Sequence, residues 1–162
     1  MALISEHIIG LLQYRIQQEE YSVRVYKAMA VWLEFKGYLG AAKLFQKYSD
    51  EEFEHAQWVY DYLMGLSVMP KVQELSKPKC DFTGLPNVVA VAYDHELSVT
   101  NQCKKLASES LAEGDHLTYK LALKFVKEQV DELAKLQNWL DRMNAFGTDE
   151  VALRMLDNEM GG

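Results

Sequence analysis

All three prolines of this 162-residue chain fall within one short stretch, between residues 70 and 86. Proline breaks the interior of an α-helix, so the long segments on either side of this stretch are free to be helical. Neither segment shows the sustained apolar–polar alternation of a half-buried strand. The sequence therefore predicts an all-α protein in which an irregular crossover, roughly residues 66–85, separates two helical pairs.

Glycine and turn-forming residues divide each proline-free segment into two helices. The first pair is interrupted near Gly37 and Gly40, and the second near Gly114. Thr148 is expected to cap a short fifth helix. The chain from 1 to 162 is expected to form one domain. Its expected helices span residues 6–35, 39–65, 87–112, 116–145 and 148–160.

Composition excludes several classes of protein. Apolar residues make up 49 % of the chain, enough for a sizeable core. The formal charge of −7 argues against a general nucleic-acid binder, which usually carries a basic face. The two cysteines, Cys80 and Cys103, form no CxxC pair, which excludes a zinc ribbon or a rubredoxin-type iron site.

The same features predict where the protein acts. Two thiols are no disulfide framework, and a reducing cytoplasm is the simplest location. The N-terminus lacks the basic region of a signal peptide, and Glu6, His7 and Gln13 interrupt its apolar run. No apolar stretch approaches the roughly 20 residues of a membrane span. We therefore expect a cytoplasmic protein that contacts neither membrane nor nucleic acid.

Each long helix carries a seam of core positions spaced alternately by three and four residues, the pattern of a helical bundle. These seams are apolar except near their middles. The polar residues that interrupt them there are Glu19, Glu52, His55, Glu96, Gln129 and Glu132.

Glutamate is almost never fully buried without compensation, because an isolated ionised carboxylate in an apolar core is very costly. No lysine or arginine is expected on these seams to pair with the four glutamates. Four carboxylates carry four negative charges, which two divalent metal ions would balance. The seams therefore predict a dinuclear metal site.

The spacing of the six polar residues supports a shared site. Glu19 and Glu52 are 33 residues apart, as are Glu96 and Gln129. In each half a second polar residue follows three positions later on the same helix face. Residues equidistant from the turn of a helical hairpin lie at the same height, so all six side chains should meet at one level.

Plainer interpretations exist for each residue alone. Any single glutamate could be misphased by one position and simply solvated, and His55 alone would more often be a hydrogen-bonded core histidine. Tyr26, seven residues after Glu19, is more often plain core, but it is well placed to hydrogen-bond or donate an electron at the site. Six coincident misphasings with matched spacing are far less plausible than a metal site.

Oxygen-rich ligation with one imidazole suits iron or manganese better than a thiolate-loving metal, although zinc would also bind. Glu-x-x-His motifs that project into a bundle core are typical of ferritin-like di-iron carboxylate proteins. The segments around these residues resemble the iron-site motifs of bacterial non-haem ferritins over nearly the whole chain. They are Glu19-Glu20-Tyr21-Ser22, Asp50-Glu51-Glu52-Phe53-Glu54-His55, Asp94-His95-Glu96 and Lys127-Glu128-Gln129-Val130-Asp131-Glu132.

This resemblance implies a role for each residue. Glu19, Glu52 and His55 would hold a first iron. Glu96 and Glu132 would hold a second, with Glu52 bridging the two.

The resemblance also implies a second set of roles. Gln129 would lie beside the second iron, and Tyr26 matches the family's tyrosine near the iron centre. A third iron site would share Glu132, although Asp131 is one methylene shorter than the glutamate often found there. The other residues implied for this third site are Glu51 and Glu128.

Related families fit less well. Bacterioferritin carries haem on a methionine where this chain has Phe53, so no haem is expected. It also has Glu-x-x-His in the fourth helix, where this chain has Gln129 and Glu132. Rubrerythrins have rubredoxin-like cysteines, and mini-ferritins build their sites between subunits.

Three classes of function remain open: an iron-storing ferroxidase cage, a small di-iron oxidase or peroxidase, and a bundle that merely binds metal. The resemblance implies the first, with Fe(II) and either O2 or H2O2 as substrates and a shell of 24 identical subunits. The fifth helix favours this reading, because its apolar positions need a partner beyond the bundle seams.

Overall fold

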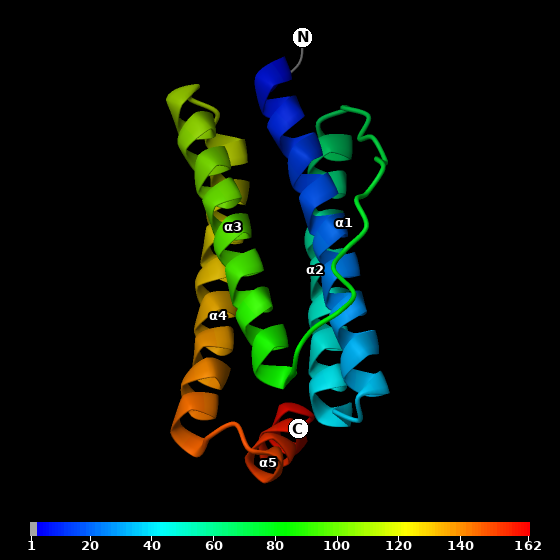
Figure 1. Ribbon diagram of the computed structural model, residues 1–162. Coiled ribbons are helices and arrows are strands. Elements are labelled where there is room, and N and C mark those ends of the chain that lie inside the picture. The colour runs from blue at the N-terminus through cyan, green and yellow to red at the C-terminus, as the bar shows by residue number, and fades with distance from the viewer. Residues whose placement is uncertain (1–2) are drawn as a thin grey trace.

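The computed structural model describes residues 3–162 and folds them into five α-helices with no strand among them. Figure 1 shows the four long helices as two hairpins, with α5 lying across one end. The predicted four-helix bundle with a long crossover and a short fifth helix is confirmed. Residues 1 and 2 lie outside the described part, and the single domain stays a prediction. The helices are α1 (Glu6–Phe35), α2 (Leu39–Gly65), α3 (Leu85–Ala112), α4 (His116–Phe146) and α5 (Glu150–Met160).

Two helix ends differ by one or two residues from the approximate predicted bounds. Helix α3 begins at Leu85 rather than at residue 87, since Pro86 sits in its first turn, where a missing N–H costs nothing. Helix α4 ends at Phe146, one residue later than expected, and Gly147 follows in the left-handed region with φ 91°.

The start of α5 also differs from the prediction. Asp149, not Thr148, is the N-cap, and its side chain accepts a hydrogen bond of 2.9 Å from the backbone N–H of Ala152. An aspartate at this position also places its negative charge against the positive end of the helix. Helix α5 therefore begins at Glu150 instead of residue 148.

The crossover between α2 and α3 has no regular structure and runs beside α1 (Figure 1). Gln13 of α1 holds it with three bonds: its Oε1 accepts from the N–H of Lys71, its Nε2 donates to the carbonyl of Met69, and its carbonyl accepts from the side chain of Gln73. One turn further along α1, Gln17 donates to the carbonyl of Glu74 at 3.0 Å. These side chains satisfy backbone groups that no secondary structure pairs.

The buried apolar residues form two separate clusters, one toward each end of the bundle. All four long helices contribute to both clusters. The end near α5 includes Leu33, Phe45 and Leu136, and the opposite end includes Leu12 and Phe125. The polar residues that interrupt the predicted seams fall between these clusters on every helix.

Helix α5 packs on the end of its own bundle. Leu153, Leu156 and Met160 join the apolar cluster there. Asp157 is buried and accepts a hydrogen bond of 2.7 Å from the backbone N–H of Ala41, in the first turn of α2. The expectation that α5 has no partner in its own bundle is therefore wrong for this side of the helix.

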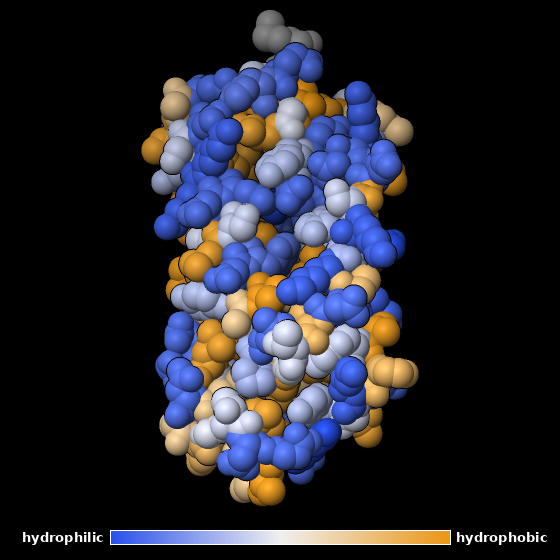
Figure 2. Space-filling view, viewed as in Figure 1, coloured by the Kyte–Doolittle hydropathy of each residue, from blue (hydrophilic) through white to orange (hydrophobic). Residues whose placement is uncertain are grey.

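The other side of α5 is left open. Val151 is 70 % exposed and Met155 is 65 % exposed. Figure 2 shows apolar residues scattered among hydrophilic ones over the face that carries α1 and α3. No helix in the described residues is long and apolar enough to cross a membrane.

The closest backbone approach between α5 and the bundle occurs at two glycines. A Cβ on Gly40 would lie 1.9 Å from the carbonyl oxygen of Asp157, and one on Gly161 would lie 2.7 Å from the Cα of Gly40. Gly40→Ala should therefore force α5 off the bundle end and destabilise the protein by about 1–3 kcal/mol. Thermal unfolding and amide exchange of α5 measure the effect.

The matched control is Gly10→Ala, because Gly10 is also helical and a Cβ there meets nothing within 4 Å. This variant should be neutral or gain about 0.5–1 kcal/mol from the lower entropy of the unfolded chain. Equal stability of the two variants would show that the glycine contact does not dock α5.

Candidate metal centre

Three of the predicted ligands meet in the middle of the first hairpin. Glu19 of α1 and Glu52 and His55 of α2 are buried, and one ligand atom from each lies within 4.8 Å of the others. The Nδ1 of His55 is 3.3 Å from a Glu52 oxygen and 3.8 Å from a Glu19 oxygen. Among the described residues no other group of three histidine, cysteine or acidic side chains comes this close.

The second hairpin contributes a hydrogen-bonded set at the same level. Glu96 of α3 is buried, and its Oε2 accepts a 2.5 Å hydrogen bond from the amide of Gln129 on α4. Its Oε1 accepts a hydrogen bond from the hydroxyl of Tyr26 on α1. The same amide nitrogen of Gln129 lies 3.2 Å from the Thr100 hydroxyl oxygen. Glu96 is therefore positioned by both hairpins.

Glu132 lies at the edge of this layer. Its side chain is buried, and one oxygen is 3.4 Å from the Nζ of Lys135, which is half-exposed. A half-exposed lysine one turn away can swing into solvent, so the pair leaves Glu132 available to a metal ion. The structure does not include Glu132 in the three-residue cluster.

The prediction that no basic residue faces these carboxylates is wrong. Arg15 of α1 is only 2 % exposed, and its Nε lies 3.1 Å from an oxygen of Glu19. The contact lacks hydrogen-bond geometry, so Nε and Nη2 of Arg15 and both Glu19 oxygens have no hydrogen-bond partner. The sequence does contain a sign of this contact, because Arg15 lies four residues before Glu19 and therefore on the same helix face.

Burial changes the charge of this layer. It raises the pKa of Glu52 well above its ordinary value, and the neighbouring Glu19 carboxylate raises it further. It also raises the pKa of Glu96 to about 7, although hydrogen bonds from Tyr26 and Gln129 oppose the change. The metal-free layer therefore holds protons near neutral pH, in place of full negative charge.

The donor set fits a divalent cation. Carboxylate oxygens and one imidazole are the ligands that iron and manganese prefer. The two buried Glu19 oxygens accept no hydrogen bond, which is costly, and Arg15 at 3.1 Å offsets only part of that cost. Arg15 supplies one positive charge to a layer of four carboxyl groups and leaves most of them uncompensated.

Tyr26 is completely surrounded by the bundle. Its ring packs against Phe45 and Tyr48, and burial together with the charge of Glu96 raises its pKa well above the ordinary value. It therefore remains protonated and acts as a hydrogen-bond donor to Glu96. Electron donation from Tyr26 stays a prediction.

The structure adds His95 to this neighbourhood, which sequence reasoning did not single out. Its ring packs edge-on against Tyr26, and its Nε2 lies 2.8 Å from the Ser22 hydroxyl oxygen. Burial lowers the pKa of His95 to about 4, so the imidazole is neutral. No spacing signal marks it, because it is adjacent to Glu96 and points to a different helix face.

The residues expected at a third iron site lie on the outer side of the layer. Glu51 and Glu128 are partly exposed, and Asp131 is exposed. One oxygen of Glu128 is 3.9 Å from the Nε2 of His55. These residues do not form a compact ligand group here, and the third site stays a prediction.

Comparisons with known proteins agree with this architecture. The family model "Ferritin-like domain" matches residues 9–146. The chain belongs to this family of ferritin-like proteins.

Individual relatives cover almost the whole chain. A Haemophilus influenzae protein named "Probable bacterial non-heme ferritin-like protein" is 26 % identical, over 98 % of this chain and 96 % of its own. The "Bacterial non-heme ferritin" of Escherichia coli is 24 % identical over the same shares. A solved "open pore ferritin" from Archaeoglobus fulgidus superposes with a TM-score of 0.95 at 28 % identity, covering 99 % of this chain and 98 % of its own. The resemblance to bacterial non-haem ferritins is confirmed, and the ligand roles stay predictions.

The raised pKa values predict how stability of the metal-free protein depends on pH. The folded pKa of Glu96, about 7, exceeds its ordinary value of 4.5, so the folded state binds more protons between these values. The contribution to stability is complete below pH 4.5 and is lost as pH rises through 7. The unfolding temperature of metal-free protein should therefore fall over this range.

Replacing Glu52 by glutamine removes a carboxyl group with a raised pKa and should flatten this pH dependence. The control is Glu54→Gln, because Glu54 is exposed on the same helix. Calorimetric scans across the range measure all three proteins. A wild-type unfolding temperature that rises with pH, or identical slopes for the two variants, would contradict buried protonated carboxyls.

Proposed function

We propose that this protein is an iron-storage ferritin that oxidises Fe(II) at a dinuclear centre and keeps the ferric product inside a multi-subunit cage. The observation that carries the proposal is the buried group of Glu19, Glu52 and His55, in which both Glu19 oxygens lack a hydrogen bond although Arg15 lies 3.1 Å away. Such a group is unfavourable in an apolar core unless cations bind there. Full-length similarity to bacterial non-heme ferritins supports iron as the cation.

In this proposal each hairpin supplies most of the ligands of one iron ion. Glu19, Glu52 and His55 bind the first Fe(II), and Glu96 and Glu132 bind the second, with Glu52 shared. Gln129 orients Glu96 through its 2.5 Å hydrogen bond. The partly exposed Glu51 and Glu128, with Asp131, would take a third ion that moves toward the store.

The reaction transfers one electron from each of two Fe(II) ions. With O2 as oxidant, two electrons and two protons yield H2O2; with H2O2 as oxidant, the same numbers yield two molecules of water. The protein supplies a fixed pair of sites and a pocket with little water. The apolar clusters on both sides of the layer limit the entry of water.

In this proposal the carboxyl groups also bind protons in the metal-free protein and release them when Fe(II) binds. Those of Glu52 and Glu96 hold protons in the metal-free protein, because burial raises their pKa. Binding of Fe(II) releases these protons, since a metal ligand must be deprotonated. Tyr26 keeps its proton and holds one Glu96 oxygen in place.

Exposed apolar surface supports assembly into a cage. Phe35 is 84 % exposed, and a groove of about 800 Å³ between α1, α2 and the crossover is lined by apolar side chains that include Val31 and Phe53. Val151 and Met155 form a second exposed apolar area on α5. Large exposed apolar patches on one chain mark interaction surfaces. We propose 24 identical subunits, as the family resemblance implies, and a cytoplasmic location.

A small di-iron oxidase that stores nothing is the second candidate. The buried ligand layer alone would serve it equally well. The exposed apolar areas on α1, α2 and α5 favour the cage, because a monomeric oxidase has no use for them. Measuring particle mass and retained iron separates the two.

Glu52→Ala should reduce the initial rate of Fe(II) oxidation by at least about 100-fold, because it removes the shared ligand. It need not unfold the protein, since deleting this carboxyl group also removes repulsion with Glu19. Anaerobic loading with two Fe(II) per chain, then mixing with air, gives the rate by absorbance.

Glu54→Ala is the control, because Glu54 lies on the same helix but is exposed. It should oxidise Fe(II) at the wild-type rate. If Glu52→Ala also kept that rate, the dinuclear assignment would be wrong.

Assembly is tested on the open side of α5. Val151→Glu combined with Met155→Glu should block or weaken cage formation, since buried unpaired charges are costly at an interface. Their side chains point away from the bundle, so the folded subunit and its first Fe(II) oxidation should survive. Asn158→Glu adds charge at an exposed position of the same helix and serves as the control.

Sedimentation at micromolar concentration measures the assembly. Wild type should run as one large hollow particle, and the control should match it. A wild-type monomer or dimer would refute the cage and leave the di-iron oxidase.

A further inference from the structure

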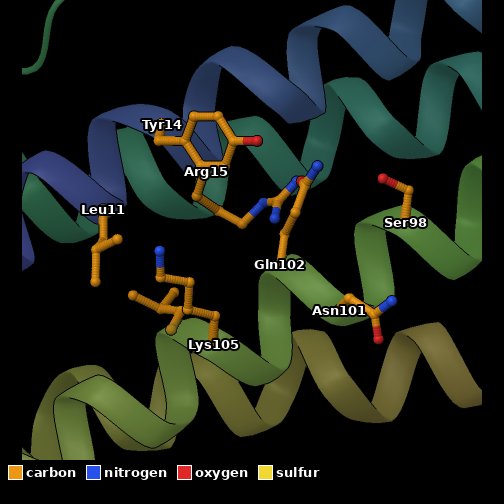
Figure 3. Close-up of a pocket in the computed structure, with 8 residues that line it drawn as sticks. Leu11, Tyr14, Arg15, Ser98, Asn101, Gln102 and Lys105 are labelled. Atoms are coloured by element: carbon orange, nitrogen blue, oxygen red, sulfur yellow. The ribbon is translucent and has the colours of Figure 1, made fainter.

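A second pocket lies on the surface between α1 and α3, next to the carboxylate layer. Its volume is about 430 Å³, and Figure 3 shows Arg15 extending from α1 toward Gln102 of α3 inside it. Two cations and four neutral polar side chains line it, and no carboxylate does. These residues are Tyr14, Arg15, Ser98, Asn101, Gln102 and Lys105.

This charge pattern is opposite to that of the whole chain. The protein has a formal charge of −7, yet the pocket gathers two positive side chains without an acidic one. Lys105 is exposed, and its Nζ is 3.9 Å from an oxygen of Glu109, a long and screened contact. The pocket lining therefore carries positive and no negative side chains, although Arg15 also lies 3.1 Å from Glu19, which does not line the pocket.

Arg15 has unused hydrogen-bonding capacity. Its Nε and Nη2 are buried and have no hydrogen-bond partner, and the buried Oε1 of Gln102 also has none. A guanidinium carries five N–H donors in a fixed fork. Even if Gln102 turned to accept one of them, and Glu19 another, donors would remain unsatisfied. Glu19 already supplies one anionic charge at 3.1 Å, and a second anion would satisfy further donors of the guanidinium.

We propose that the pocket between α1 and α3 binds a small inorganic oxyanion, such as phosphate, on the guanidinium of Arg15. Lys105 supplies a second charge at the mouth, and Ser98, Asn101 and Tyr14 supply neutral donors. A pocket of about 430 Å³ holds a tetrahedral anion with some water, and Leu11 and Leu106 complete its lining beside the polar side chains.

Arg15 also links this pocket to the metal layer. Its Nε is 3.1 Å from Glu19, which the proposed function makes an iron ligand. A metal ion on Glu19 takes up the negative charge that faces Arg15, so the guanidinium then favours an anion more strongly. Linkage is reciprocal: the anion should raise the affinity for metal by the same factor. This second step rests on the proposed function, whereas anion binding to metal-free protein does not.

Phosphate binding to the metal-free, full-length protein tests the first step by titration calorimetry. We expect one saturable site per chain. Lys105→Glu should weaken binding at least about tenfold, because it replaces attraction by repulsion at the mouth. Arg15→Lys should also weaken it, since a lysine keeps the charge but loses the bidentate fork.

Lys104→Glu is the matched control, because Lys104 is equally exposed, precedes Lys105 and does not line the pocket. It should keep the wild-type affinity. Absence of saturable binding in wild type, or equal weakening by Lys104→Glu and Lys105→Glu, would overturn the proposal.

Zinc affinity in saturating sulfate, against chloride at equal ionic strength, tests the second step. Sulfate replaces phosphate here because it does not precipitate zinc. Wild type should bind zinc about fivefold or more tightly in sulfate, and Lys105→Glu should show no such gain. Equal gains in both proteins would overturn the linkage. Phosphate binding that persists in Glu52→Ala while Fe(II) oxidation is lost would show that the two sites stand independently.

Discussion

Four glutamate side chains lie at one level inside the bundle, and the guanidinium of Arg15 is the one lysine or arginine group buried among the described residues. This imbalance of charge governs the rest of the structure. Water cannot solvate the carboxyl groups, so they keep protons, as Glu52 and Glu96 do, or receive cations. The polar side chains of all four long helices must lie at the same level if they are to share bound cations. The hairpin geometry, with its turns near Gly37 and Gly114, meets that requirement.

Stability comes from regions on either side of this layer. The cluster near α5 and the cluster near the start of α1 bury apolar side chains from all four long helices. Burial of this kind is the dominant favourable contribution to folding, and it allows the middle of the bundle to remain poorly satisfied. The arrangement separates two requirements that conflict within one core: apolar packing lies at the two ends, and the buried polar side chains lie in the layer between them.

Periodicity and spacing predicted most of this arrangement. The polar seam positions, from Glu19 to Glu132, are all buried, because a bundle core imposes a strict three-and-four spacing. Arg15 was missed, although it lies four residues before Glu19, because the predicted seam runs through its neighbour Ile16. The cap of α5 moved from Thr148 to Asp149 because two adjacent residues can both cap, and only the chain's path decides. The docking of α5 through Gly40 depends on a backbone approach between segments distant in sequence, which no local pattern encodes.

The division of the core into two apolar clusters has a consequence for cooperativity. Helix packing is closest within each hairpin, between α1 and α2 and between α3 and α4. The carboxylate layer lies where the two hairpins face each other, and few side-chain hydrogen bonds cross it, from Tyr26 to Glu96 and between Ser22 and His95. The two apolar ends are connected by helices that run through this layer. In the proposed function, cations held by ligands from both hairpins would fasten the hairpins to each other at the layer, so that opening there would require loss of the cations.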